Sequence, residues 1–219
     1  MVKLFKIIIL IFISKISFAE SIKETDKYSI KFEKNLIHDI DNSLKEQTIN
    51  IVVEISKNTS SKWQISKIDG SLEHEFFMGE PRIVNYSPYP VNYGIIPRTV
   101  IPINKGGDGD PLDAIILGKE IEMGKVMKVK VIGVLKMTDF GEQDDKIIAV
   151  QLNDEFSKYN EINELKKSNN NLLDEVILWF QNYKGENIIK VAGYESSIEA
   201  VNLIMMGSRY YEKYGIKKR

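Results

Sequence analysis

The sequence predicts an α+β fold in one domain, with strands in the first two thirds and helices near the end. Short runs rich in β-branched and aromatic residues recur between residues 49 and 150, with turn residues between them. Residues 172–180 and 198–211 instead carry apolar side chains at helical spacing. No repeat, low-complexity tract or long linker divides the chain. Residues 20–219 are therefore predicted to be a single domain.

Residues 1–19 have the pattern of a secretory signal peptide. Lys3 and Lys6 give a positive start, residues 7–13 are an apolar core, and Ser17-Phe18-Ala19 places small residues at the cleavage positions. The apolar run is too short to cross a bilayer as a permanent helix. We expect an exported protein, periplasmic or secreted, with no stable membrane association after cleavage. A buried N-terminal strand is the alternative interpretation.

The charge balance argues against a nucleic-acid-binding protein. The chain has 30 Lys and Arg and 31 Asp and Glu, and loss of residues 1–19 would leave 27 basic against 31 acidic residues. A mildly acidic chain lacks the basic face that phosphate backbones require. There is no cysteine, and the two histidines, His38 and His74, are too few for a histidine-rich metal site. We expect both histidines to be surface or packing residues.

The predicted strands begin after a polar lead-in. Residues 20–48 are mixed in character, and we expect them to be loosely structured. Residues 49–55 form a β-rich run in which Glu54 replaces an apolar residue, which indicates an edge position or a functional carboxylate. Residues 62–65 and 70–76 alternate like the two strands of a hairpin.

The remaining elements are an irregular segment, further strands and two helices. Residues 82–97 interleave tyrosines, prolines and an arginine without periodicity, so we expect an irregular segment that offers phenol and guanidinium donors. Residues 125–135 and 147–150 continue the sheet. Ser196 is the expected cap of the last helix, and the apolar stripes of both helices are interpreted as core.

An acidic turn interrupts the strands. Its sequence is Asp108-Gly109-Asp110-Pro111-Leu112-Asp113, so that three carboxylates lie within six residues, directly before an apolar strand. Like charges this close repel, so the turn would be destabilised unless a cation lay among the carboxylates. Carboxylate oxygens suit Mg²⁺, Mn²⁺ or Ca²⁺. Taken alone, the turn fits a hard-metal site or a solvated acidic loop.

This turn and two later motifs together resemble the family I soluble inorganic pyrophosphatases. The later motifs are Gly-Val-Leu-Lys-Met-Thr-Asp at residues 133–139 and Asp144-Asp145-Lys146, and they agree with the family in order and spacing. The resemblance runs from about Glu54 to about Tyr194. It implies a twisted five-stranded OB-like β-barrel flanked by two or more α-helices, with the active site at the barrel mouth. It also implies Mg²⁺-dependent hydrolysis of pyrophosphate to two orthophosphates by metal-activated water.

The resemblance assigns roles position by position. It implies a metal site formed by Asp108, Asp110, Asp113, Asp139 and Asp144. Asp110 is also the implied general base for the attacking water. The implied substrate-binding residues are Lys62, Arg82, Tyr93, Tyr183 and Lys184, and the implied supporting residues are Glu54, Tyr89 and Lys146. Mg²⁺ is the expected cofactor, with Mn²⁺ or Zn²⁺ as substitutes. A homo-oligomer is expected, with a hexamer favoured over a dimer, and the family's cytoplasmic location is the alternative to export.

Four features depart from the family pattern. Gln64 stands where the family usually has an acid, and Phe140 follows Asp139 where a polar residue is common. About five extra residues lengthen the approach to the acidic turn near residues 101–105. Arg82 matches the family's arginine only if the following loop differs by one residue; otherwise Phe76 would occupy that position. These departures leave the expected metal ligands intact.

Other readings of the acidic turn fit less well. A haloacid-dehalogenase-type phosphatase would share the Asp108-Gly109-Asp110 pair, but there the apolar strand precedes the pair rather than following it. A calcium-stabilised OB-type binding module without catalysis would need a glutamate at the twelfth loop position, which is Lys119. A nucleic-acid-binding barrel is disfavoured by the acidic balance.

We predict that the native protein lacks residues 1–19, because the lysine start, the apolar core and the small residues at 17 and 19 fit signal-peptidase cleavage. Mass spectrometry of protein from the native cell should find Glu20 as its first residue. An intact N-terminus on a cytoplasmic protein would contradict the prediction.

Overall fold

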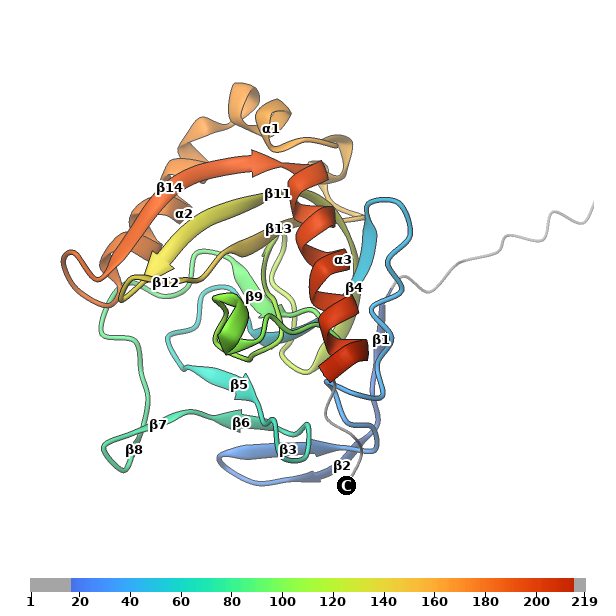
Figure 1. Cartoon of the computed structure of the whole chain (residues 1–219). Helices are drawn as coiled ribbons and strands as arrows, with labels where there is room; N and C mark the ends of the chain where they lie inside the picture. Colours follow the sequence, from blue (N-terminus) through green and yellow to red (C-terminus); the bar gives the residue numbers. More distant parts are fainter. Residues whose placement is uncertain (1–16, 215–219) are drawn as a thin grey trace, which may run out of the picture.

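Five strands close into a barrel in the part of the chain that the computed structural model describes, residues 17–214 (Figure 1). In order around the barrel they are β4 (Thr48–Ile55), β9 (Asn92–Ile95), β10 (Asp113–Leu117), β13 (Lys146–Gln151) and β11 (Lys125–Asp139). Each strand pairs with the next, and β11 pairs with β4 to close the ring. Only β10 and β13 run parallel among these pairs. The expected five-stranded OB-like barrel is confirmed.

The barrel closes because β11 is long and bent. Its register shifts between Val131 and Gly133 against β13, and between Lys136 and Met137 against β14 (Ile189–Ser196). Such irregularities increase the local twist and let one strand serve several partners. Glycine is needed where backbones cross closely: a Cβ on Gly94 would lie 2.0 Å from the carbonyl oxygen of Val52.

Alternating side chains of the barrel strands enter two apolar clusters. In β10, Ile115 and Leu117 belong to one cluster, and Ala114 and Ile116 belong to the other. This is the period-two pattern of a strand that is buried on both faces.

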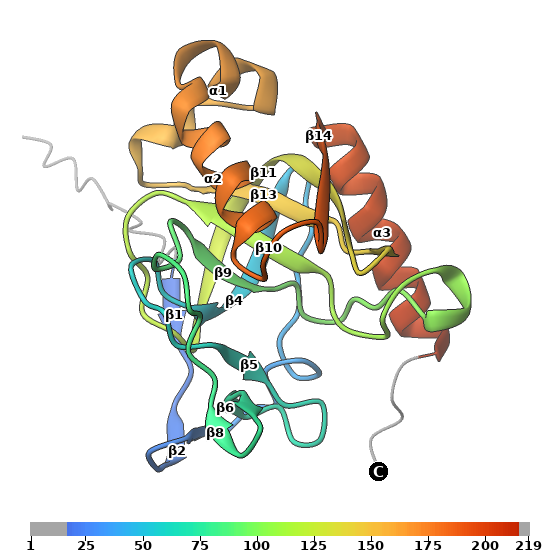
Figure 2. The ribbon, with the colours of Figure 1, turned by 90° about the vertical axis from the view of Figure 1, so that its left-hand side faces the viewer.

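Helices cover the two clusters from opposite sides of the barrel (Figure 2). Helix α2 (Asn170–Asn182) packs Trp179 and Phe180 into the first cluster, and α3 (Ser197–Tyr214) packs Ala200 and Ile204 into the second. Both predicted helices are therefore confirmed as core elements. The hydroxyl of Ser196 accepts a hydrogen bond from the backbone N–H of Glu199 at 3.3 Å, as expected for a cap.

The prediction of a loosely structured lead-in is wrong. Residues 20–48 contain β2 (Ile22–Thr25) and β3 (Ser29–Phe32), followed by the buried side chains of Leu36, Ile37 and Ile40. These apolar residues contact partners far away in the chain; for example, the carbonyl of Ile37 accepts from the N–H of Arg98 at 3.1 Å. The local sequence has too little periodicity to reveal such distant burial.

Strands β2 and β3 belong to a second sheet, which also contains the predicted hairpin. Its order is β2-β3-β6-β5, where β5 is Trp63–Ile65 and β6 is Leu72–His74. His74 stacks on Trp63 with ring centroids 5.0 Å apart, and Nδ1 of His38 lies 2.7 Å from the Tyr211 hydroxyl. Both histidines are packing residues, as expected. This sheet lies beside one end of the barrel (Figure 1).

The segment 82–97 is less irregular than predicted, because it contains the buried strand β9. The smaller elements are β1 (Ser17–Ala19), β7 (Phe76–Phe77), β8 (Glu80–Pro81), β12 (Glu142–Gln143), α1 (Ile162–Ser168) and the 3₁₀ turns η1 (Ile103–Lys105) and η2 (Glu155–Lys158). Helix α1 and strand β14, which pairs with β11, were not predicted.

The predicted signal peptide lies almost wholly outside the described residues. Its last three residues, Ser17–Ala19, form β1 and pair with β11. Cleavage after Ala19 would remove β1 and leave the five barrel strands in place. No helix within residues 17–214 is long and apolar enough to span a bilayer.

Candidate active site

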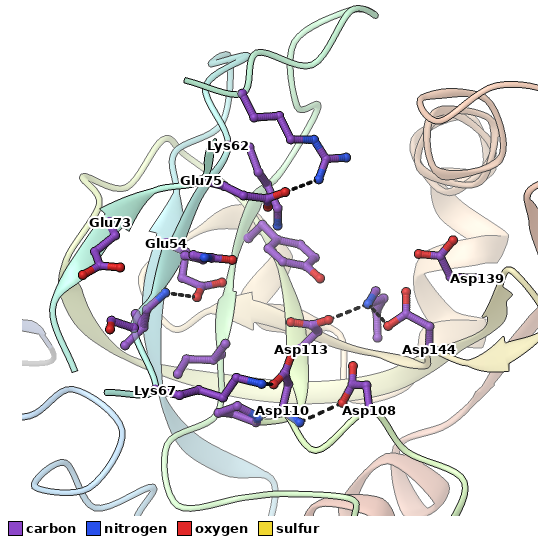
Figure 3. A pocket seen from close by; sticks show the side chains of 18 of the residues that line it. Glu54, Lys62, Lys67, Glu73, Glu75, Asp108, Asp110, Asp113, Asp139 and Asp144 are labelled. Carbon is purple, nitrogen blue, oxygen red and sulfur yellow. Dashed lines mark hydrogen bonds and ion pairs between the residues drawn. The ribbon is translucent and has the colours of Figure 1, made fainter. Parts of the chain in front are cut away.

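A cavity of about 580 Å³ opens at one end of the barrel, facing the second sheet (Figure 3). It brings together residues from positions 54 to 184 of the sequence. Of the residues proposed from the sequence, it is lined by Glu54, Lys62, Arg82, Tyr93, Asp108, Asp110, Asp113, Asp139, Asp144, Lys146, Tyr183 and Lys184. Tyr89 is buried behind this wall. The cavity therefore gathers the acidic and the phosphate-binding candidates on one surface.

The acidic turn is fastened to the barrel at its end. The N–H of Leu112 donates to the Thr99 hydroxyl at 2.9 Å, and the carbonyl of Leu112 accepts from Ile96 at 2.8 Å. Within the turn, the N–H of Asp110 donates to Oδ1 of Asp108 at 2.8 Å. Gly109 has φ +81°, which a side chain would disfavour. Asp113 then begins β10, so its carboxylate is held by a barrel strand.

A buried lysine balances the charge at the centre of the site. Lys146 is 3% exposed and donates to both Asp113 and Asp144. Burial by itself lowers the pKa of Lys146, but the two carboxylates outweigh burial and raise that pKa above its usual value. Lys146 therefore stays charged at any physiological pH and offsets part of the repulsion between the carboxylates.

Three further cations around the cavity each pair with an acid. Lys184 donates to Oδ2 of Asp139, and Arg82 donates to Glu75. Lys67 donates to Oδ1 of Asp110 (Figure 3). Arg82 lines the cavity, whereas Phe76 is half exposed on β7 and does not line it. Of the two positions considered for the family's arginine, only that of Arg82 thus lies at the cavity.

The tyrosines of the site are held by an aromatic stack. Tyr183 stacks on Trp179 with ring centroids 4.5 Å apart. The ring centroid of Tyr89 lies 4.3 Å from that of the same Trp179. Burial raises the pKa of Tyr89, Tyr93 and Tyr183 above the usual value for a phenol. All three hydroxyls therefore keep their protons and can donate hydrogen bonds.

The carboxylates fit a divalent cation by their chemistry. Oδ1 of Asp139 is buried and has no hydrogen-bond partner within the described chain. Burial raises the pKa of Asp108 and of Asp144, so both acids lack full compensation for lost water. Hard oxygen donors of this kind suit Mg²⁺ or Mn²⁺. Within residues 17–214, no three acidic or histidine side chains already gather around one point; Lys67, Lys146 and Lys184 hold several of the acids instead.

Glu54 joins the barrel to the second sheet. Its Oε1 accepts from the N–H of Ile65 at 2.7 Å, and the residue is 5% exposed. Burial, only partly offset by nearby Lys62, raises the pKa of Glu54 to about 7. This carboxyl group is therefore close to half protonated at neutral pH.

Sequence reasoning missed several residues of the cavity wall, including Lys67, Glu73, Glu75 and Gln143. The N–H of Glu75 donates to the carbonyl of Lys62 at 2.9 Å, so the predicted hairpin could have placed Glu75 beside Lys62. No comparable signal marks Lys67, because its contact with Asp110 joins residues 43 positions apart. The departures Gln64 and Phe140 also line the cavity, at its more exposed rim.

A barrel-end cavity that combines five aspartates with lysines, an arginine and neutral phenols is typical of enzymes that process phosphate groups with the help of divalent cations. A sequence model described as inorganic pyrophosphatase matches residues 51–212, which is more than half of the chain. The chain belongs to the inorganic pyrophosphatase family.

Individual relatives agree with this assignment. The inorganic pyrophosphatase of Helicobacter pylori is 29% identical over 166 residues, covering 74% of this chain and 90% of that protein. The mitochondrial inorganic pyrophosphatase of Saccharomyces cerevisiae is 33% identical over 195 residues, covering 75% of this chain and 63% of that one. The solved structure of the truncated Trypanosoma cruzi vacuolar soluble pyrophosphatase in complex with PPi has a TM-score of 0.71 at 26% identity, covering 90% of this chain and 79% of that one.

We predict that Glu54→Gln stabilises the cation-free protein at pH 8. In the wild type, the raised pKa of Glu54 means that the folded state binds more protons than the unfolded state between pH 4.5 and about 7. Stability is therefore lost as pH rises through this window, by roughly 1 to 3 kcal/mol. Urea unfolding in the presence of a chelator, between pH 5 and 8, should show that the free energy of unfolding of the variant rises relative to that of wild type as pH increases. Glu212→Gln, at an exposed position of α3, is the control, and an equal pH trend in both variants would contradict the prediction.

Proposed function

We propose that this protein catalyses the Mg²⁺-dependent hydrolysis of pyrophosphate to two orthophosphates. The observation that carries the proposal is the single cavity in which Asp108, Asp110 and Asp113 face Lys146 and Arg82, in a chain of the inorganic pyrophosphatase family. Pyrophosphate is a small polyanion, so a site for it needs fixed donors for its oxygens and positive charge against repulsion. The cavity offers both.

The positive and phenolic groups would bind the two phosphates. Lys62 and Lys184 lie on the cavity wall with Arg82, whose planar guanidinium can form paired hydrogen bonds with phosphate oxygens. Tyr93 and Tyr183 remain protonated and would donate single hydrogen bonds. Because these phenols are fixed by buried packing, they need little reorganisation during the reaction.

The acidic groups would handle the water and the cations. Asp108, Asp113, Asp139 and Asp144 would hold divalent cations, together with Asp110, and such cations when bound offset phosphate charge and make water more acidic. Asp110 would accept the proton of the attacking water while the water oxygen bonds to phosphorus. The bridging P–O bond then breaks, and the second orthophosphate leaves from the side lined by lysine and arginine.

A calcium-stabilised module without catalysis is not favoured, since the family to which the chain belongs is one of hydrolases. The direct test is phosphate release from pyrophosphate by the purified protein. We expect activity with Mg²⁺ or Mn²⁺, partial activity with Zn²⁺, and inhibition by Ca²⁺, whose larger coordination sphere tolerates the compact substrate chelate poorly. Full activity after exhaustive chelation, or no phosphate release with Mg²⁺, would refute the proposal.

We also propose that the enzyme is exported and forms a homo-oligomer, with a hexamer preferred to a dimer. Export is supported by the lysine start and apolar core of residues 1–19. Oligomerisation is supported by exposed apolar side chains on two helices, Leu178 on α2 and Ile198, Met205 and Met206 on α3.

Asp110→Asn and Asp108→Asn should fail in different ways. If Asp110 takes the proton from water, its nearly isosteric amide should keep the fold while turnover falls about 10²- to 10⁴-fold. Asp108→Asn should chiefly weaken cation binding, so excess Mg²⁺ should partly restore its activity but not that of Asp110→Asn. Steady-state rates across a Mg²⁺ series test this. An Asp110→Asn enzyme within a few-fold of wild type at saturating Mg²⁺ would show that Asp110 is structural.

Arg82→Ala should impair pyrophosphate turnover far more than Arg98→Ala. Arg82 lines the cavity, whereas the guanidinium of Arg98 donates to the carbonyl of His38 at 3.0 Å and does not line it. Loss of a charge-assisted bond to phosphate should cost about 1.5 to 3 kcal/mol in kcat/KM. Kinetics of both variants, with circular dichroism to confirm folding, decide the point. Equal effects would indicate that Arg82 has only a structural role, through its ion pair with Glu75.

A further inference from the structure

Lys67 links the second sheet to the acidic turn. Its Nζ donates to Oδ1 of Asp110, and both side chains are about half exposed, at 53% and 46%. Among the ion pairs of residues 17–214, this is the one that joins the β2-β3-β6-β5 sheet to residues 108–113. Figure 3 shows the lysine reaching the carboxylate from the side of that sheet.

The backbone at the base of Lys67 is fixed. The N–H of Ser66 donates to the carbonyl of Ser71 at 2.8 Å, and the N–H of Gly70 donates to the carbonyl of Ser66 at 2.9 Å. These two backbone bonds close the β5–β6 turn. One residue before Ser66, the N–H of Ile65 is held by buried Glu54. The backbone of the lysine is therefore placed by a hydrogen-bonded turn, while about half of its side-chain surface is exposed to solvent.

Lys67 differs in this respect from Lys146, the buried lysine of the site. Lys146 is buried and bonds two carboxylates, so it cannot move away without leaving them unbalanced. Lys67 bonds one carboxylate at the exposed rim and can turn outward into water. An exposed ion pair of this kind shifts an equilibrium by up to about fivefold.

We propose that Lys67 is a positioning residue that competes with divalent cations for Asp110, and so sets the cation concentration at which the enzyme loads. This inference rests on the proposed function. In the cation-free protein Lys67 holds Asp110 against the repulsion of Asp108 and Asp113. A cation that binds Asp110 must first displace the ammonium group from that carboxylate, which costs the free energy of the ion pair. Removal of this charge should therefore strengthen cation binding.

The test is a calorimetric titration of Mg²⁺ into the cation-free full-length protein, without pyrophosphate. Lys67→Met should lower the dissociation constant about 3- to 5-fold, whereas Lys67→Arg, which keeps the charge, should stay within about twofold of wild type. The matched control is Lys125→Met, because Lys125 forms an exposed ion pair with Glu122 away from the cavity. This control should bind Mg²⁺ as wild type does. If Lys67→Met does not fold, Lys67→Gln replaces it.

A double-mutant cycle shows whether the effect passes through Asp110. In an Asp110→Asn background, Lys67→Met should change the dissociation constant less than twofold. An unchanged or weaker affinity of the single variant would overturn the inference, as would an equal effect in both backgrounds. If wild type binds Mg²⁺ and hydrolyses pyrophosphate but Lys67→Met shows no tightening, only this inference fails. If wild type does neither, the proposed function fails with it.

Discussion

The balance of charge in the barrel-end cavity is the constraint on which the rest of the site depends. Carboxylates that face one another in a partly dry space repel, and burial disfavours their charged form further. Lys146 reduces this repulsion, because it is buried between Asp113 and Asp144 and remains protonated there. Asp139 pairs with Lys184 through Oδ2, but its buried Oδ1 has no hydrogen-bond partner within residues 17–214, so this oxygen is still available to a cation. A site whose carboxylates are not fully compensated by lysines suits divalent cations and the polyanions that accompany them.

Strand direction explains why the acids meet. Strands β10 and β13 are parallel neighbours and begin at Asp113 and Lys146, so their first residues lie at the same edge. Strand β11 runs antiparallel to β13 and therefore ends at that edge, with Asp139 as its last residue. The acidic turn delivers Asp108 and Asp110 to the same place because it leads directly into β10. Three chain segments thus converge through pairing rules alone.

The second sheet completes the site from the other side. Its hairpin carries Lys62 and Lys67 over the cavity, and Glu54 fastens it to the barrel through one buried hydrogen bond. On the remaining side, α2 holds Tyr183 by its stack on Trp179. The groups that would touch substrate are therefore supported by rigid elements, which keeps their geometry fixed without substrate. Glu54 shows the cost of this support: it links the two sheets by a hydrogen bond, but its carboxyl group is buried, and burial raises its pKa.

The sequence by itself determined the features that depend on near neighbours. Alternation gave the hairpin around Gly70, helical spacing gave α2 and α3, and the spacing of Asp108, Asp110 and Asp113 marked the acidic turn. Only the tertiary structure decided what depends on distant pairing: the burial of Leu36 and Ile37, strand β14 beside β11, and the contact of Lys67 with Asp110. Local periodicity reports one face of one element, whereas these features arise where elements from different parts of the chain meet, and no short window of sequence contains both partners.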